Sequence, residues 1–256
     1  MKSPENHKFI FIGGLHRSGT SLIHRCLREH PLISGFENSP SPEDEGQHLQ
    51  TVYLAANYFG GPGRFAFYPD ARLTEETSLV SEQNKLKLFN EWTKYWILEK
   101  PFLLEKSPPN IIRTRFLQAL FPNSFFVIVT RHPVATCYST MKWRPRQKFS
   151  AISLLKHWLV CHEIFDKDRQ YLKNILVMKY EDFVTDYNNQ LHRICNFLNI
   201  PTFQPSENIL QQTNEEYFKI WEKKRYVFLR KYAILRFEKR MLKFGYSLLN
   251  VRCKEK

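Results

Sequence analysis

The chain has 256 residues and a formal net charge of +13 at pH 7, and 43% of its residues are hydrophobic. This composition is ample for a folded core, and no apolar run approaches the roughly 20 residues that span a bilayer. Without a secretory pattern either, the chain is expected to be cytoplasmic, with no integral membrane segment. The five cysteines include no C-x-x-C pair, which argues against a zinc site or disulfide framework and predicts buried, reduced thiols.

Predicted strands and helices alternate along the chain. Four short, uniformly apolar runs predict strands buried on both faces, at residues 9–12, 102–104, 125–130 and 175–178. Helical patterns occupy residues 21–30, 43–57, 78–98, 110–120, 133–141, 150–172 and 188–198, and loops are expected at 35–42 and 57–70. The alternation predicts a three-layer α/β fold, a central parallel sheet flanked by helices, with ligands at the carboxyl ends of the strands.

A glycine-rich turn joins the first predicted strand to the first predicted helix. Its spacing, Gly14-x-x-x-x-Gly19, matches a phosphate-binding loop, in which backbone N–H groups and a helix N-terminus favour an anion. Nucleotide triphosphatases carry a lysine where this chain has Thr20, followed here by Ser21. The cation is instead Arg17, inside the loop. We therefore expect the turn to bind a phosphate without the groups that handle a triphosphate.

A second basic signature follows the strand predicted at 125–130. Arg131 ends that strand beside a helix N-terminus, and Ser139 lies two turns along the helix. An arginine and a hydroxyl so placed suit a second phosphate. The alternative is an arginine paired with a carboxylate and a serine that faces solvent. No aspartate ends this strand to bind magnesium, which speaks against ATP or GTP hydrolysis.

Together these motifs resemble the cofactor signatures of sulfotransferases that use 3′-phosphoadenosine-5′-phosphosulfate (PAPS) and release the bisphosphate PAP. Four motifs in the same order span residues 9–182, with spacing similar to the tyrosylprotein branch and bacterial relatives. The resemblance implies a P-loop-like sulfotransferase fold. It implies that Arg131 and Ser139 hold the 3′-phosphate and that Tyr180 lies near the adenine. The implied 5′-phosphosulfate loop comprises Gly14, His16, Arg17, Ser18, Gly19, Thr20 and Ser21.

The resemblance also implies in-line transfer of the sulfuryl group to an acceptor hydroxyl. Lys106 occupies the position of the branch's catalytic lysine, and with Arg17 it would stabilise charge on the bridging and leaving oxygens. A sulfuryl group carries less negative charge than a phosphoryl group, so no metal is required. A glycan, a lipid, a small molecule or a protein tyrosine would each fit as acceptor.

The resemblance implies that a Glu or His just after the first helix acts as the general base. The candidates, in order, are Glu45, His48, Glu37 and Glu43. Glu45 and His48 lie three residues apart and would share one face of the predicted helix. The alternative is that acidic residues here are only partners of the helix dipole.

Other side chains have weaker assignments. His16 either faces the sulfuryl group beside Arg17 or marks a position that tolerates any side chain. Several aromatic residues could line the acceptor pocket, although their spacing is more typical of a core: Trp92, Trp96, Phe65, Phe67 and Tyr68. A basic run lies where the family places a late contact to the 3′-phosphate: Lys223, Lys224 and Arg225.

We expect one sulfotransferase domain over residues 1–256, with a basic helical segment at about 207–256. Residues 217–256 hold thirteen Lys or Arg and three Glu. This segment is interpreted as a solvated helical face, with one or two basic residues reaching a ligand, rather than a nucleic-acid surface. Two rival functions are a nucleotide-dependent phosphotransferase, which would require magnesium and ATP, and an inactive relative that binds PAP without turnover.

Overall fold

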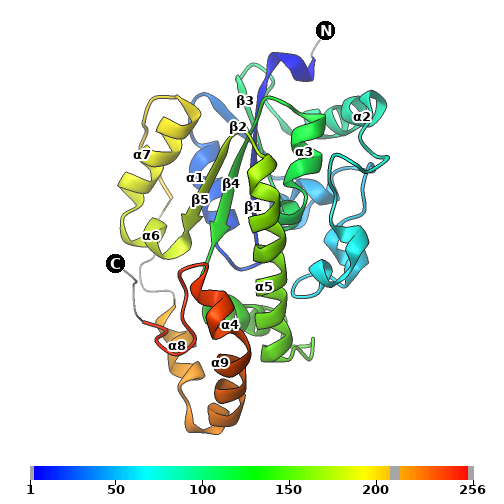
Figure 1. Cartoon of the computed structure of the whole chain (residues 1–256). Helices are drawn as coiled ribbons and strands as arrows, with labels where there is room; N and C mark the ends of the chain where they lie inside the picture. The colour runs from blue at the N-terminus through cyan, green and yellow to red at the C-terminus, as the bar shows by residue number, and fades with distance from the viewer. Residues whose placement is uncertain (1–2, 208–213, 253–256) are drawn as a thin grey trace.

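The computed structural model describes residues 3–207 and 214–252 (Figure 1). Within this part, five strands form one parallel sheet: β1 (Lys8–Gly14), β2 (Ile33–Gly35), β3 (Phe102–Lys106), β4 (Ser124–Thr130) and β5 (Ile175–Lys179). Their order is β2-β3-β1-β4-β5, so β1 lies at the centre, with Ile10 beside Leu104 and Phe125. The predicted parallel sheet is confirmed. Strand β2 was not predicted, since three residues are too few to show a pattern.

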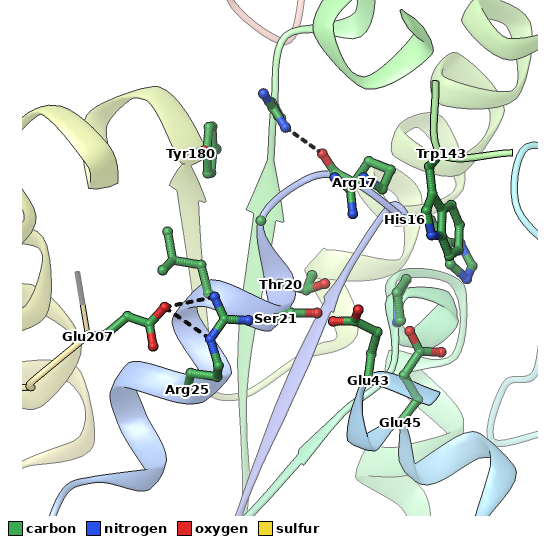
Figure 2. Close-up of a pocket in the computed structure, with 14 residues that line it drawn as sticks. His16, Arg17, Thr20, Ser21, Arg25, Glu43, Glu45, Trp143, Tyr180 and Glu207 are labelled. Carbon is green, nitrogen blue, oxygen red and sulfur yellow. Dashed lines mark hydrogen bonds and ion pairs between the residues drawn. The ribbon is translucent and has the colours of Figure 1, made fainter. Parts of the chain in front are cut away.

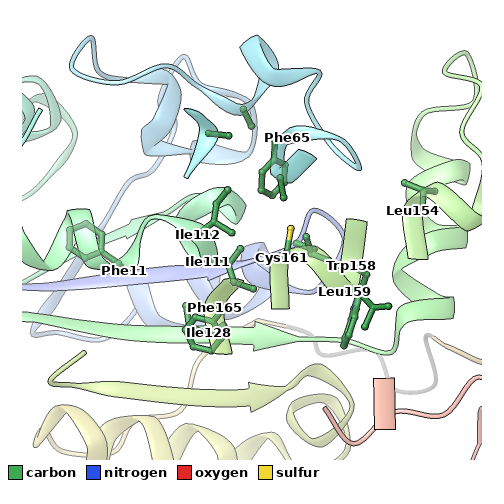
Figure 3. Packing of buried hydrophobic residues seen from close by; sticks show 14 of the residues in the cluster. Phe11, Phe65, Ile111, Ile112, Ile128, Leu154, Trp158, Leu159, Cys161 and Phe165 are labelled. Atoms are coloured by element: carbon green, nitrogen blue, oxygen red, sulfur yellow. The ribbon is translucent and has the colours of Figure 1, made fainter. Parts of the chain in front are cut away.

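Side chains alternate between the two faces of the sheet, and each face carries a helical layer. Phe9 and Phe11 of β1 join one apolar cluster, and Ile10 and Ile12 join the other. The first cluster is covered by α2 (Glu82–Trp92), α3 (Thr114–Leu120) and α5 (Ala151–Asp168). The second is covered by α1 (Thr20–Arg28), α6 (Tyr180–Thr185) and α7 (Tyr187–Leu198). Figure 3 shows part of the first cluster, whose members include Ile128 of β4 and Trp158 and Phe165 of α5. The three-layer prediction is therefore confirmed.

The remaining helices lie beyond the carboxyl ends of the strands (Figure 1). They are α4 (Pro133–Trp143), α8 (Glu215–Trp221) and α9 (Val227–Leu242). Helix α8 contacts α4, and α9 contacts α5. The expected basic helical segment is therefore helical at α8 and α9, at the end of the molecule where parallel α/β sheets bind ligands.

The prediction of a helix at residues 43–57 is wrong. Short 3₁₀ turns replace it, at Pro42–Asp44, Gly46–His48 and Ala56–Phe59. Glu43 and Asp44 have φ angles of 55° and 52°, in the left-handed region, where an α-helix cannot continue. Distant groups hold this backbone, because Lys106 Nζ donates to Glu43 O at 2.6 Å and Trp92 Nε1 donates to Gly46 O at 3.0 Å.

Two other predicted helices are shorter than expected. Helix α2 begins only after Ser81, whose hydroxyl accepts a hydrogen bond from Asn84 N at 3.1 Å and caps the helix. The segment predicted at 110–120 starts as a 3₁₀ turn, Pro108–Ile112, and becomes α-helical at α3.

Cysteine burial matches the prediction at the four described positions. Cys26, Cys137, Cys161 and Cys195 are free thiols and buried, whereas Cys253 lies outside the described residues. Over residues 3–207 and 214–252, no helix is both long and apolar enough to cross a membrane.

Candidate functional site

The loop between β1 and α1 has the compact backbone that a phosphate cradle requires. Gly19 precedes α1 with a φ of 104°, and a Cβ atom there would lie 2.3 Å from the Tyr180 ring. Only glycine fits this position. A Cβ atom on Gly14 would lie 2.7 Å from Ser18 Oγ, which accepts a hydrogen bond from Leu15 N at 3.2 Å. Because the first N–H groups of a helix have no partner within it, those of α1 can bind an anion here.

Strand β4 lies beside β1 and brings the second basic signature to this loop. Arg131 Nη1 donates a hydrogen bond to Arg17 O at 2.9 Å, and Arg17 Nε donates to Ser139 Oγ at 3.2 Å. The Arg131 guanidinium also lies 4.3 Å from the centroid of the Tyr180 ring. Ser139 is 2% exposed, so it does not face solvent. The two signatures form one continuous cluster.

A partly buried carboxylate, Glu181, holds the Arg131 side chain in place through the amide of Asn214. Arg131 Nε donates to Asn214 Oδ1 at 2.9 Å, and Asn214 Nδ2 donates to Glu181 Oε1 at 2.6 Å. Glu181 also accepts a hydrogen bond from His132 N at 2.9 Å and one from the Tyr246 hydroxyl at 3.1 Å. Asn214 and Glu181 were not predicted as site residues, although Glu181 adjoins Tyr180.

A cavity of about 430 Å³ opens beside this cluster, within the size range of small-molecule sites. Most of the predicted cofactor-binding residues line it: His16, Arg17, Gly19, Thr20, Ser21, Arg131 and Tyr180. Gly14, Ser18 and Ser139 do not line the cavity. Gly14 and Ser18 shape the loop, where Ser18 Oγ accepts a hydrogen bond from Leu15 N, and Ser139 Oγ accepts one from Arg17 Nε.

The opposite wall carries acidic residues from the segment after β2. Glu43 and Glu45 both line the cavity, and their carboxylates point toward the loop before α1 (Figure 2). Lys106 ends β3 behind them with no exposed surface, and its Nζ lies 3.6 Å from Glu45 Oε1. Burial lowers the pKa of Lys106, and the nearby carboxylates oppose that shift. An acid and a buried cation are thus paired at the cavity wall.

Hydrogen bonds fix the orientation of Glu45. Gln47 Nε2 donates to Glu45 Oε2 at 2.6 Å, and Gln47 N donates to Ser107 Oγ at 2.9 Å. Ser107 Oγ in turn donates to Glu105 Oε1 at 2.6 Å. Burial raises the pKa of Glu105 to about 7. This series of hydrogen bonds connects the Glu45 carboxylate to the end of β3, the strand that also carries Lys106.

The other two candidate bases do not line the cavity. Glu37 has a side chain that is 62% exposed and ion-paired with Arg28 Nη2 at 3.2 Å. His48 Nε2 lies 3.9 Å from Glu45 Oε2, and burial lowers the pKa of His48. Glu45 and His48 are therefore close, as expected, but across a 3₁₀ turn instead of on an α-helix. Among residues 3–207 and 214–252, no group of three or more His, Cys, Asp or Glu could hold a metal ion.

His16 faces the cavity as a neutral ring. It lies between the Trp143 ring, at 6.1 Å, and the Phe65 ring, at 5.9 Å. Burial, with smaller effects from Lys106 and Arg144, lowers the pKa of His16 to about 3. The imidazole is uncharged at neutral pH and cannot share the positive charge of Arg17.

Arg25 and Glu207 line the cavity but were not predicted (Figure 2). Arg25 Nε and Nη2 donate to Glu207 Oε1 at 3.0 and 2.8 Å. Arg25 lies four residues after Ser21 on α1, which places both side chains on one helical face. This spacing could have identified Arg25 as a site residue. Glu207 had no such signal, because its partner lies 182 residues away in the chain.

The aromatic candidates divide between core and surface. Trp92 and Trp96 are buried, and their indole N–H groups donate to Gly46 O and Leu104 O at 3.0 Å. They belong to the core, as does Phe65. Phe67 and Tyr68 are 37% and 50% exposed and do not line the cavity. The late basic run does not line the cavity either, and its three residues are exposed: Lys223, Lys224 and Arg225. Their contact to the 3′-phosphate stays a prediction.

Comparisons with known proteins identify the family. The family model described as "Sulfotransferase family" matches residues 10–205. Protein-tyrosine sulfotransferase A of Caenorhabditis elegans is 25% identical over a 210-residue alignment that covers 75% of this chain and 50% of that protein. The chain thus spans about half the length of this curated relative.

Solved sulfotransferase structures share the fold. Sulfotransferase STF1 from Mycobacterium tuberculosis H37Rv superposes with a TM-score of 0.52 at 16% identity, over 85% of this chain and 73% of that one. A sulfotransferase from Alicyclobacillus acidocaldarius gives a TM-score of 0.50 at 18% identity, over 84% and 91% of the two chains. With a family model that covers well over half of its length, the chain belongs to the sulfotransferase family.

Proposed function

We propose that this chain transfers a sulfuryl group from PAPS to the hydroxyl group of an acceptor. The observation that carries the proposal is the joined cluster of the two basic signatures, in which Arg17 contacts both Arg131 and Ser139. A nucleotide with phosphate groups at two positions of one ribose needs two cations in one cavity, and Arg17 and Arg131 supply them. The loop has Thr20 where a triphosphatase has lysine, which disfavours ATP.

The residues of the cavity fit such a nucleotide. The Gly19 backbone approaches the Tyr180 ring so closely that no side chain fits between them, and α1 begins there with its free N–H groups. In the proposed complex, residues 14–21 hold the 5′-phosphosulfate, Arg131 with Ser139 holds the 3′-phosphate, and Tyr180 lies near the adenine. When bound, PAPS supplies the activated sulfuryl group.

Glu45 is the proposed general base. It lines the cavity, and its Oε2 accepts a hydrogen bond from Gln47, so Oε1 is the oxygen that receives the proton of the acceptor hydroxyl. Arg17 stabilises negative charge on the bridging oxygens. Lys106 adds positive potential from behind Glu45, at 3.6 Å from its Oε1, where low polarity strengthens the effect. Glu43 is the alternative base, since it also lines the cavity.

The acceptor is proposed to be a hydroxyl compound. The relative from Caenorhabditis elegans is named for protein tyrosine, so a tyrosine-containing peptide is the first acceptor to test, followed by a phenol, a glycan and a hydroxylated lipid. Radiolabelled PAPS is incubated with each acceptor and the wild-type protein or Glu45→Gln. Label on one acceptor, strongly reduced in Glu45→Gln, supports the proposal. PAP binding without transfer to any acceptor indicates an inactive relative, and phosphate transfer from ATP indicates a phosphotransferase.

A further inference from the structure

Helix α9 exposes a ridge of large apolar side chains. Phe228 is 82% exposed, Tyr232 54%, Leu235 89% and Leu242 41%. Their spacings of four, three and seven residues place them on one face of the helix. Single exposed apolar residues are ordinary on protein surfaces, but four aligned on one helix form a patch that marks an interaction site.

The ridge points away from the protein, because the opposite face of α9 is already packed. Ala233, Phe237 and Met241 are at most 3% exposed and belong to the large apolar cluster. They follow a four-residue spacing displaced by half a helical turn from the ridge. The ridge therefore contributes nothing to this core.

Cations lie beside the ridge and within it. Lys231, Arg236, Lys239 and Lys243 are exposed, and in the described part of the chain none of them forms an ion pair. The acidic residue of α9, Glu238, turns inward and accepts hydrogen bonds from Ser247 Oγ and Leu248 N, both at 2.6 Å. Lys239 stands within the ridge, four residues after Leu235 and three before Leu242, so the exposed face of α9 combines large apolar side chains with positive charges. Further exposed cations precede the helix: Lys223, Lys224 and Arg225.

We infer that α9 docks on the surface of an anionic lipid bilayer. Apolar side chains on a convex helix enter the boundary between headgroups and acyl chains, while flanking Lys and Arg bind anionic headgroups. A second copy of this chain is a poor occupant, because two positively charged faces would repel. A nucleic acid would neutralise the cations but would leave Leu235 and Phe228 in water.

The position of α9 gives this surface a functional orientation. The helix lies beyond the carboxyl ends of the strands (Figure 1). The cavity is at the same end of the sheet, because Arg17 after β1 and Arg131 after β4 line it. Docking through α9 would bring that end of the protein close to the bilayer. The inference itself rests on α9 alone and does not depend on the proposed sulfuryl transfer.

Vesicle flotation tests the inference with the full chain. The probes are vesicles of phosphatidylcholine alone and vesicles containing phosphatidylserine, at physiological salt. Two variants alter α9, Phe228→Ser with Leu235→Ser for the apolar side chains and Lys231→Glu with Lys239→Glu for the cations. The matched controls are Ile97→Ser, which removes a 57% exposed apolar side chain elsewhere, and Lys87→Glu, which reverses an exposed charge on α2.

We expect the wild-type protein to float with the phosphatidylserine vesicles and not with phosphatidylcholine alone. Each α9 variant should weaken that binding by about tenfold or more, since each cation contributes roughly 1 kcal/mol at an anionic surface. Both controls should bind like the wild type. Circular dichroism checks that all four variants keep their helical content. Failure of the wild type to bind, or binding that survives loss of Phe228 and Leu235, overturns the inference. If the wild type does not bind vesicles, an acidic protein is the remaining partner for the ridge.

Discussion

Arg17 Nε donates a hydrogen bond to Ser139 Oγ at 3.2 Å, across 122 residues of sequence. Arg17 belongs to the loop after β1, and Ser139 lies on the helix after β4. Adjacent parallel strands bring the two together, because their carboxyl ends share one edge of the sheet. This contact makes two phosphate-binding signatures into one site, and the proposed function depends on it.

Arg131→Ala should weaken PAP binding about 100-fold or more. In the proposed complex the arginine would supply a charge-assisted contact to phosphate in a buried setting, worth about 3 kcal/mol or more when removed. Isothermal titration of PAP measures the change, with Arg146→Ala as the control at an exposed arginine. Thermal unfolding without ligand shows whether the variant is still folded. An unchanged affinity for PAP would contradict the assignment of Arg131.

Glu45→Gln should lower kcat about 100-fold and leave PAP affinity nearly unchanged. The amide cannot accept the acceptor proton, and general base catalysis typically contributes about 10²–10⁴-fold. Glu37→Gln is the control, because Glu37 is 62% exposed and paired with Arg28 outside the cavity. Steady-state rates with saturating acceptor distinguish the two variants. If Glu37→Gln is the slower enzyme, the base has been misassigned.

Gly19→Ala should destabilise the protein by about 2 kcal/mol and abolish tight PAP binding. The new Cβ atom would lie 2.3 Å from the Tyr180 ring at a φ of 104°, and a side chain at positive φ costs about 1–3 kcal/mol before any clash. Gly61→Ala is the control, since it adds a side chain at a φ of 71° with no atom closer than 3.0 Å. Chemical denaturation and PAP titration are measured for both. Equal PAP affinity in the two variants would show that the Gly19–Tyr180 contact does not shape the nucleotide site.

Stability should fall as the pH drops below about 6.5. Burial lowers the pKa of His132 and of His157 to about 3 and that of His162 to about 4. The unfolded chain therefore takes up protons at a pH where these folded side chains stay neutral. Their contribution to the free energy of unfolding is fully present above pH 6.5, the ordinary pKa of histidine. It is lost as the pH falls toward the pKa of the folded side chain, in total about 3–5 kcal/mol per histidine.

Glu105 acts in the opposite direction but is outweighed. Burial raises its pKa from 4.5 to about 7, so its contribution grows as the pH falls through this range, by about 3 kcal/mol. The urea midpoint, measured between pH 7.5 and about 4.5, should therefore decrease with acidification. His157→Gln should flatten the curve, because glutamine takes up no proton on unfolding, and its side chain can still accept the hydrogen bond from Ala66 N. The exposed control His192→Gln should not flatten it. A midpoint that does not change with pH would show that these histidines are not buried as neutral groups.

The strands and the phosphate loop could be predicted because their signals are local. Uniformly apolar runs marked four of the five strands, and the Gly14–Gly19 spacing marked the loop. In the structure Gly19 adopts a positive φ, which explains why glycine stands there.

The acidic wall could not be predicted in its true form, because distant residues determine it. Glu43 and Asp44 are held in left-handed conformations while Lys106 binds the Glu43 carbonyl from β3. Local spacing instead favoured a helix. The ion pair of Arg25 and Glu207 has the same origin, since it joins residues 182 positions apart. A helical period or a dipole argument uses only neighbours in the sequence and cannot show such contacts.

A thermal-shift titration of the wild-type protein with PAP, ADP and ATP distinguishes a PAPS-dependent site from that of a phosphotransferase. It is run without magnesium and, for ATP, also with it. We expect stabilisation by PAP without metal and little effect of ADP, because Arg17 and Arg131 lie in one cavity and a diphosphate carries no 3′-phosphate. A shift only with ATP and magnesium would contradict the proposed function and would indicate a phosphotransferase.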